Sequence, residues 1–191
     1  MQAIRHMETV NRSQLGRGRL RQKQKWHPEQ PEEPGDAILS ETFANGFGVF
    51  TPQDITGTQA WYADTQYHYV KMSAYQQGST YDNEDWLVSP AVDLSKSRTL
   101  AFEQAFGPAN KDMSNAAEIY TLWVSDNYSG DVATATWTQV AIEYPSESGW
   151  TFVPTSVTLP ATGKNAHFAF KYKNTASDAT LTWEIKNLTV K

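Results

Sequence analysis

The sequence contains no cysteine among its 191 residues. This absence excludes a disulfide framework, a thiol nucleophile and any metal site with cysteine ligands. Any stabilising link or metal site must therefore be built from packing, hydrogen bonds and oxygen or histidine ligands.

Long apolar runs are also missing. No segment approaches the roughly 20 apolar residues that a membrane-spanning helix needs. The first 26 residues carry charge but lack the apolar stretch of a secretory signal peptide. If the protein works outside the cell, we expect its export signal to lie upstream of this sequence or to be missing from it.

Recognisable catalytic motifs are absent as well. There is no G-x-S-x-G, no H-E-x-x-H and no glycine loop for phosphate, and neither His68 nor His167 stands in a triad motif. Spacing alone leaves open a carboxylate pair for glycoside hydrolysis. The acids to examine for that reaction are Glu41, Asp85, Glu103 and Glu184. We predict that the protein is not an enzyme and has no catalytic residues, with a glycoside hydrolase as the weaker alternative.

Charge divides the chain into two parts. Residues 1–35 hold seven Lys/Arg and four Asp/Glu, a net charge of +3, and end in the Pro/Glu-rich stretch PEQPEEPG. The remaining residues hold nine Lys/Arg and seventeen Asp/Glu, a net charge of −8. The sequence therefore predicts a disordered basic leader and linker over 1–35 and one domain over 36–191. An acidic domain repels phosphates and anionic lipid, so we expect neither nucleic acid nor membrane insertion.

The domain is rich in strand patterns. Aromatic residues make up 13% of the sequence, which suits strands because flat rings pack on a pleated surface. Apolar and polar residues alternate over 100–106, 119–124, 166–172 and 181–190, and no apolar 3.6-residue period persists for three turns after residue 36. Further strands are expected over 38–43, 66–74, 135–143 and 149–159. About ten short strands indicate a sandwich or a barrel; we predict an all-β fold, a two-sheet antiparallel β-sandwich of jelly-roll type.

Three motifs resemble a known family. They are ETFANGFG at 41–48, EDWLVSPAVDLS at 84–95 and WEIKNLTV at 183–190. Together they resemble the choice-of-anchor J domains, which are related to the cleaved adhesin domains and more remotely to MAM domains. The resemblance covers roughly 36–191, and the middle motif is its most specific part. It implies a jelly-roll sandwich that is a module of surface-exposed or secreted proteins, mostly of Bacteroidetes-type bacteria, with a role in adhesion or carbohydrate binding.

The same resemblance implies a structural calcium ion. In jelly-roll binding modules the first and last strands commonly lie side by side, and here they carry Glu41 and Glu184. Cleaved adhesin relatives also have an Asp-rich loop before a Trp, where this chain keeps Asp54 but has Thr and Gly in place of the later acids. Relatives often end in an Asp-Asp pair where this chain has Lys186-Asn187. The alternative is that these acids cap turns or face solvent.

Sugar binding requires exposed rings beside polar side chains. The densest group of rings lies in WYADTQYHY at 61–69, interleaved with polar residues. The candidate ligand-binding residues are Trp61, Tyr62, Asp64, Tyr67, Tyr69, Tyr75 and Tyr81. Alternation places Trp61, Tyr67 and Tyr69 on one side of a strand, and if that side is the core the rings are only packing.

We therefore expect a non-catalytic adhesion or carbohydrate-binding module, located outside the cell or on its surface. Its expected partners are a glycan or a surface protein and the neighbouring domains of a parent protein. A structural or protein-interaction spacer without a small-molecule ligand is the alternative. The expected cofactor is none, or a structural calcium ion.

Overall fold

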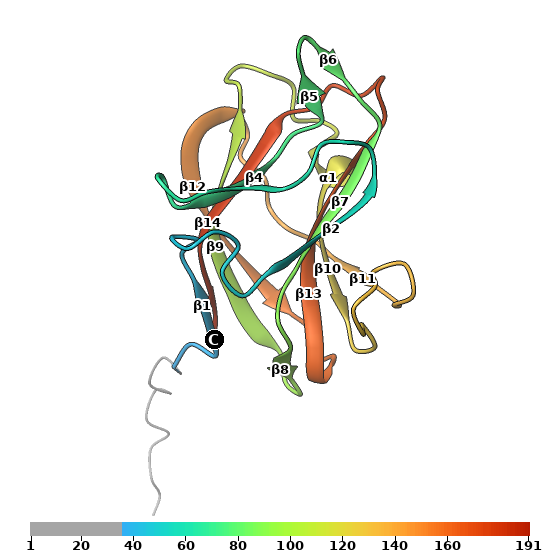
Figure 1. Ribbon diagram of the computed structural model, residues 1–191. Coiled ribbons are helices and arrows are strands. Elements are labelled where there is room, and N and C mark those ends of the chain that lie inside the picture. Colours follow the sequence, from blue (N-terminus) through green and yellow to red (C-terminus); the bar gives the residue numbers. More distant parts are fainter. Residues whose placement is uncertain (1–35) are drawn as a thin grey trace, which may run out of the picture. The chain divides into compact units, whose positions relative to one another are not determined.

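The computed structural model describes residues 36–191, which form two antiparallel sheets packed face to face (Figure 1). The predicted leader and linker over 1–35 lie outside the described residues. Among the described residues, no helix has both the length and the apolar character that crossing a membrane requires. The predicted all-β sandwich is confirmed.

The first sheet contains both ends of the described chain. Its strands, in order, are β12 (Gly149–Leu159), β9 (Arg98–Gly107), β14 (Thr182–Val190), β4 (Tyr69–Met72) and β3 (Tyr62–Asp64), and β1 (Leu39–Glu41) also pairs with β14. Leu39 lies opposite Val190, so the first and last strands are side by side, as predicted.

The second sheet faces the first. Its strands, in order, are β11 (Thr138–Val140), β10 (Tyr120–Ser125), β13 (Gly163–Asn174), β7 (Asn83–Val88) and β2 (Thr51–Thr56), and β8 (Val92–Leu94) also pairs with β13. A small hairpin of β5 (Tyr75–Gln76) and β6 (Ser79–Thr80) and the four-residue helix α1 (Ala116–Ile119) complete the described elements. The hairpin lies at the end of the sandwich opposite the C-terminus (Figure 1).

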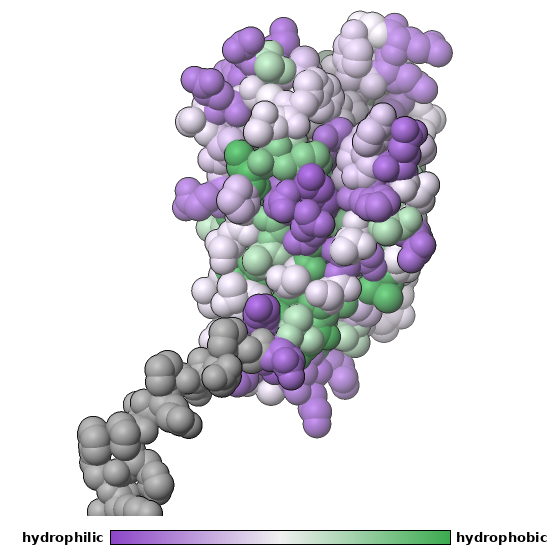
Figure 2. Space-filling model, turned by 90° about the vertical axis from the view of Figure 1, so that its left-hand side faces the viewer, coloured by the Kyte–Doolittle hydropathy of each residue, from purple (hydrophilic) through white to green (hydrophobic). Residues whose placement is uncertain are grey.

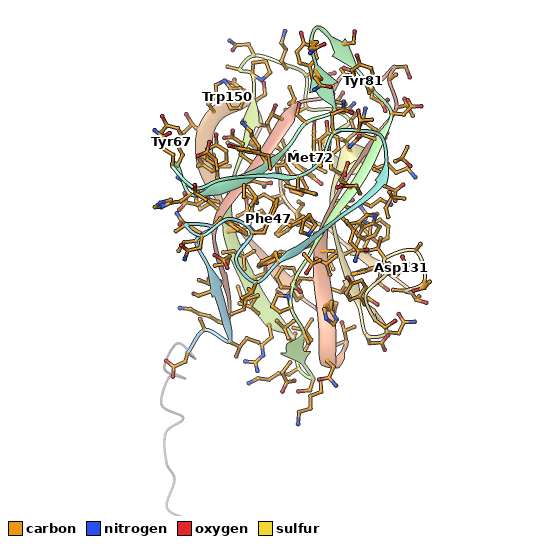
Figure 3. The ribbon with its side chains drawn as sticks, in the orientation of Figure 1. Phe47, Tyr67, Met72, Tyr81, Asp131 and Trp150 are labelled. Atoms are coloured by element: carbon orange, nitrogen blue, oxygen red, sulfur yellow. The ribbon has the colours of Figure 1, made fainter. Side chains whose placement is uncertain are left out.

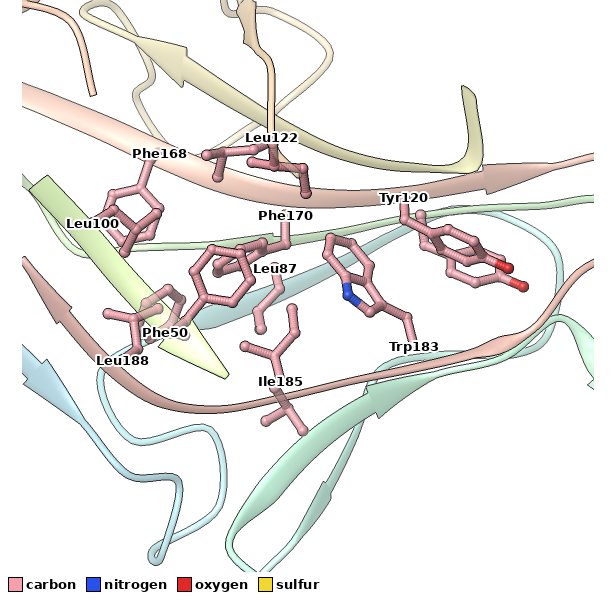
Figure 4. Packing of buried hydrophobic residues seen from close by; sticks show 14 of the residues in the cluster. Phe50, Leu87, Leu100, Tyr120, Leu122, Phe168, Phe170, Trp183, Ile185 and Leu188 are labelled. Carbon is pink, nitrogen blue, oxygen red and sulfur yellow. The ribbon is translucent and has the colours of Figure 1, made fainter. Parts of the chain in front are cut away.

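The core lies between the sheets and is dominated by rings. In β13, Phe168, Phe170 and Tyr172 are fully buried on one face, which confirms the predicted alternation. Trp183 from β14 is also fully buried and packs against Phe170 at a centroid distance of 5.6 Å (Figure 4). Each fully buried side chain of this size contributes roughly 1.5–3 kcal/mol, so these rings account for much of the adhesion between the sheets.

A second, smaller hydrophobic cluster covers the outer face of the second sheet. Leu87 points into the main core, whereas its neighbour Trp86 points outward, as strand alternation requires. Trp86 packs with Trp123 and Trp137, and the loop over 126–137 closes over it. This loop therefore shelters the Trp86 cluster on the outer face of the second sheet.

Candidate functional site

The outer face of the first sheet brings charged and aromatic side chains together. Tyr62, Lys71 and Glu184 lie in one row across β3, β4 and β14, because cross-strand partners share a face. Asp64 lies opposite Tyr69 in the next row. Figure 2 views the molecule from this side and shows hydrophilic and hydrophobic residues interspersed rather than one apolar patch.

Glu184 is the most buried charge on this face. It is only 6% exposed, and burial raises the pKa of its carboxyl, while Lys71 and Lys186 act in the opposite direction. The Lys71 ammonium also lies 5.2 Å from the Tyr62 ring centroid and 5.8 Å from that of Tyr69. Partial burial, with Glu184 and Asp64 nearby, raises the pKa of Tyr69 to about 12.

A hollow of about 470 Å³ opens at the end of this face, and we call it the ring groove. Three rings line it, and each is more than half exposed: Tyr62 at 55%, Tyr75 at 60% and Trp150 at 54%. Polar side chains lie between the rings, and they include Gln59, Lys71, Ser73 and Gln76. The ring groove therefore combines flat apolar surfaces with donors and acceptors.

Two local features hold the rings in place. Gly107 lies under the Trp150 indole, and a Cβ at that position would collide with the ring, so glycine lets the indole lie on the strand. On the other side, the Gln59 amide donates to Gln76 Oε1 at 3.1 Å, which links the loop before β3 to the hairpin that carries Tyr75. The ring groove is thus formed before any ligand arrives.

A second hollow, of about 540 Å³, adjoins the ring groove, and we call it the apolar hollow. The two hollows share Ser73, Tyr75 and Thr182. The residues that line the apolar hollow but not the ring groove include Pro108, Lys111, Asp112, Ala179, Thr180 and Leu181. Together the two hollows form one depression across the ends of β4, β14 and β9.

The predicted ring residues are only partly brought together. Tyr62 and Tyr75 line the ring groove, whereas Tyr67 stacks on Tyr69 farther along the face, with a centroid distance of 6.4 Å. Figure 3 places Tyr67 and Trp150 on this same side of the molecule. The Asp64 carboxylate accepts the amides of Gln66 and Tyr67 and so caps a turn. Tyr81 is 44% exposed but lines neither hollow.

Trp61 corrects one expectation. It is 4% exposed and packs on Trp183 at 5.9 Å, so it belongs to the core and not to an exposed platform. The predicted alternation from Trp61 to Tyr69 is wrong, because the turn at 65–68, with His68 at φ 56°, changes the face that the chain presents. Trp61 therefore points inward while Tyr69 points outward.

Sequence reasoning missed Trp150, Lys71 and Gln59. The signal available for Trp150 was a tryptophan directly after Gly149 at the start of an expected strand. Its position in the lining that it shares with Tyr62 depends on β12 pairing with β9, two segments about 45 residues apart, which local patterns do not reveal.

The expected calcium ligands Glu41 and Glu184 are not brought together. Glu41 pairs with the core residue Leu188, whereas Glu184 pairs with Lys71 on the outer face. Their register positions are also four residues apart, about 13 Å along the strand. The prediction that one calcium ion is held by both Glu41 and Glu184 is therefore wrong. Within the described residues, no group of three His, Cys, Asp or Glu side chains is arranged for a metal.

A different set of oxygens lies near Asp54. Asp54 on β2 lies opposite Asp85 on β7. Asn83 lies two residues before Asp85 on the same inward face of β7, and its side-chain amide donates to the Asp85 carboxylate. Asn83 and Asp85 are 1% and 0% exposed, and one Oδ1 of each has no hydrogen-bond partner among the described residues. Burial, with Asp54 alongside, raises the pKa of Asp85 to about 9. Unpaired buried oxygens beside two carboxylates fit a hard cation such as calcium.

The comparison of structures gives clear matches. The K1 cleaved adhesin domain of Lys-gingipain from Porphyromonas gingivalis W83 matches with a TM-score of 0.55 and 21% identity, over 80% of this chain and 96% of that domain. The K2 cleaved adhesin domain of Lys-gingipain matches with a TM-score of 0.59 and 15% identity, over 80% of this chain and 98% of that domain. The chain shares the fold of the cleaved adhesin domains. The resemblance seen in the three motifs is thus confirmed at the level of the fold.

A carbohydrate-binding protein has a related fold. The CBM22-1–GH10 modules of endo-1,4-beta-D-xylanase 10B from Clostridium thermocellum, complexed with xylohexaose, match with a TM-score of 0.51 and 10% identity. That match covers 81% of this chain and 28% of the xylanase chain. No protein-family model matches the sequence, and the comparison with curated proteins gives no match. The identities are low, so these likenesses establish the fold, and the function must be argued from the site.

Proposed function

We propose that this protein is a non-catalytic carbohydrate-binding or adhesion module that holds a glycan in the ring groove. The observation that carries the proposal is the placement of three half-exposed rings, Tyr62, Tyr75 and Trp150, around a polar hollow. Three exposed rings gathered around one hollow mark a contact surface, whereas rings scattered singly over a surface do not.

Sugars suit such a groove chemically. The C–H faces of a pyranose ring pack on tyrosine and tryptophan rings, and the hydroxyl groups need donors and acceptors beside them. Gln59, Ser73 and Gln76 offer amide and hydroxyl groups, and Lys71 offers a charged donor. A largely preformed groove spends little binding free energy on ordering the site.

Two observations support a binding role over catalysis. Glycoside hydrolysis uses two carboxyl groups flanking the scissile bond. Among the described residues, the acids considered for that reaction (Glu41, Asp85, Glu103 and Glu184) line neither hollow, and Asp112 is the one acid that does. The shared fold with adhesin domains and with a xylan-degrading enzyme's modules also supports a module that binds, acts outside the cell or at its surface, and adjoins other domains.

Glycan-array binding of the whole chain, followed by calorimetry on the strongest glycan, tests this proposal. We expect Trp150→Ala to weaken binding at least tenfold, because centrally placed rings dominate such contacts. Tyr81→Ala is the matched control, since it removes an exposed ring that lies outside both hollows, and it should bind like the wild type. Absence of binding to every glycan would overturn the proposal and favour the protein-interaction spacer.

We also propose that Asp54, Asn83 and Asp85 hold a structural calcium ion. The support is the pair of unpaired buried oxygens on Asn83 and Asp85, which a cation would satisfy. Calcium would neutralise the two facing carboxylates and fasten β2 to β7. Gly57 contributes to the cradle, because a Cβ there would collide with Asn83 Oδ1 and with the Asp82 carbonyl.

Melting temperature in calcium and in chelator tests the cation. We expect calcium to raise the melting temperature of the wild type by several degrees, because an ion that binds only the folded state stabilises it. Asp54→Asn should reduce that rise, whereas Asp64→Asn, a matched change on the outer face, should leave it intact. Equal melting temperatures in calcium and chelator would rule the ion out.

A further inference from the structure

The apolar hollow extends the ring groove toward a different chemistry. The two hollows share Ser73, Tyr75 and Thr182, so a ligand lying in one reaches the other. The ring groove has mixed polar and aromatic walls, whereas Pro108, Leu181 and Ala179 give the second hollow an apolar wall. A glycan bound across both would therefore meet two environments.

The walls of the apolar hollow are fixed by hydrogen bonds. The Leu181 amide donates to the Tyr120 hydroxyl at 2.6 Å, and the Tyr172 hydroxyl donates to the Leu181 carbonyl at 3.3 Å. The Asn115 side-chain amide donates to the Ala179 carbonyl at 3.2 Å and ties the loop after β9 to the loop before β14. The hollow is thus a standing feature and does not depend on a ligand to shape it.

The lining selects among sugar substituents. A hydroxyl group placed against Pro108 and Leu181 would lose hydrogen bonds to water without replacing them. A methyl group in the same place gains from burial. Donors and acceptors also line the hollow, on Ser73, Lys111, Asp112, Thr180 and Thr182. A substituent that carries a terminal methyl group on an amide matches this combination of apolar and polar lining residues.

We infer that the apolar hollow receives an N-acetylhexosamine residue of the bound glycan, with its acetamido methyl against Pro108 and Leu181. The amide of that substituent faces the polar side chains of the lining, and the next sugar residues pass over Tyr75 toward Trp150. This inference rests on the proposed function, because the rest of the glycan occupies the ring groove.

Paired glycans test the inference. The array compares glycans that differ only by an acetamido group in place of a hydroxyl group, and calorimetry follows on the tightest pair. We expect the acetamido member to bind about fourfold tighter or more, the gain for burying one methyl-sized group. Ala179→Leu fills the hollow and should abolish this preference, so that both members of a pair bind the variant equally.

Ala176→Leu is the matched control, because this exposed alanine lies on the same loop but does not line the hollow. It should keep the preference. Equal binding of both members of every pair, or a preference that survives Ala179→Leu, would overturn the inference while the proposed function stands. Absence of binding to every glycan would overturn both.

Discussion

Glu41 organises the loop that follows it. Its carboxylate accepts the amides of Thr42 and Phe43 at 2.9 and 2.8 Å, and that of Val49 at 3.2 Å. These bonds hold Phe43 at φ 59°, an unfavourable angle for a bulky residue, while its ring is fully buried. The carboxylate thus maintains a strained turn that delivers a core residue.

We expect Glu41→Ala to lower the free energy of unfolding by about 1–3 kcal/mol, because the buried amide of Phe43 loses its acceptor. Urea denaturation in chelator and in calcium measures this loss, which should be the same in both. Glu41→Gln, which keeps one acceptor oxygen, should lose less. A loss confined to calcium-containing buffer would instead assign Glu41 to the ion.

Asp85 should make stability depend on pH when calcium is removed. The pKa of its carboxyl is near 3.9 in an unfolded chain and about 9 in the folded protein, mainly because of burial and then Asp54. Between these values the folded state holds a proton that the unfolded state has released, so the contribution of Asp85 to stability is greatest below about pH 4 and falls as pH rises toward 9.

Urea denaturation of the wild type and of Asp85→Asn in chelator, between pH 5 and 8.5, measures this contribution. We expect the difference in stability between the two proteins to shift in favour of Asp85→Asn as the pH rises, because the amide has no proton to lose. A difference that stays constant with pH would show that Asp85 is ionised in the folded protein.

Among the elements, the loop over 126–137 depends on one side chain from β2. The Gln53 amide group donates to the Gly130 carbonyl at 2.9 Å and to the Tyr128 hydroxyl, and its oxygen accepts the Val132 amide at 3.0 Å. The loop shelters Trp86, which also stacks against the Lys171 ammonium at 4.6 Å. Figure 3 shows Asp131 of this loop on the side of the molecule opposite Trp150.

We expect Gln53→Ala to destabilise the protein by about 1–3 kcal/mol, because several partly buried groups lose their partner. Tryptophan emission should shift to the red as the Trp86 cluster opens to water, and hydrogen exchange of the Val132 amide should speed up. Glycan affinity should not change, since the ring groove lies on the other sheet. A loss of affinity equal to that of Trp150→Ala would contradict this separation.

Alternation was a reliable guide to strands and a poor guide to the site. The alternation over 166–172 predicts that Phe168, Phe170 and Tyr172 share a face, because a strand fixes that relation within a few residues. The ring groove combines Tyr62, Tyr75 and Trp150 from three distant segments, and only the sheet order brings them together. The sequence therefore indicated two of the three rings but not their meeting place.

For the whole molecule, the boundary near residue 35 stays a prediction. Seven of the sixteen Lys and Arg residues lie before it, and the nine that follow belong to the domain. We expect brief trypsin treatment to cut after Lys25 and leave a resistant fragment that begins at Trp26, as read by mass spectrometry. Equally fast cleavage after Lys96 or Lys111 would contradict the predicted boundary. Digestion in urea, which exposes all sites, is the control.

The meeting of β1 and β14 has a practical consequence. The Ile38 amide donates to the Val190 carbonyl at 2.8 Å, so the chain enters and leaves the sandwich at one end (Figure 1). Trp150 and the β5–β6 hairpin lie toward the other end (Figure 3). Because closely spaced termini are tolerated when one domain is inserted into another, residues 36–191 are suited to grafting into a surface loop of an unrelated host. The host would then display the ring groove outward, at the end of the domain that lies away from the point of insertion.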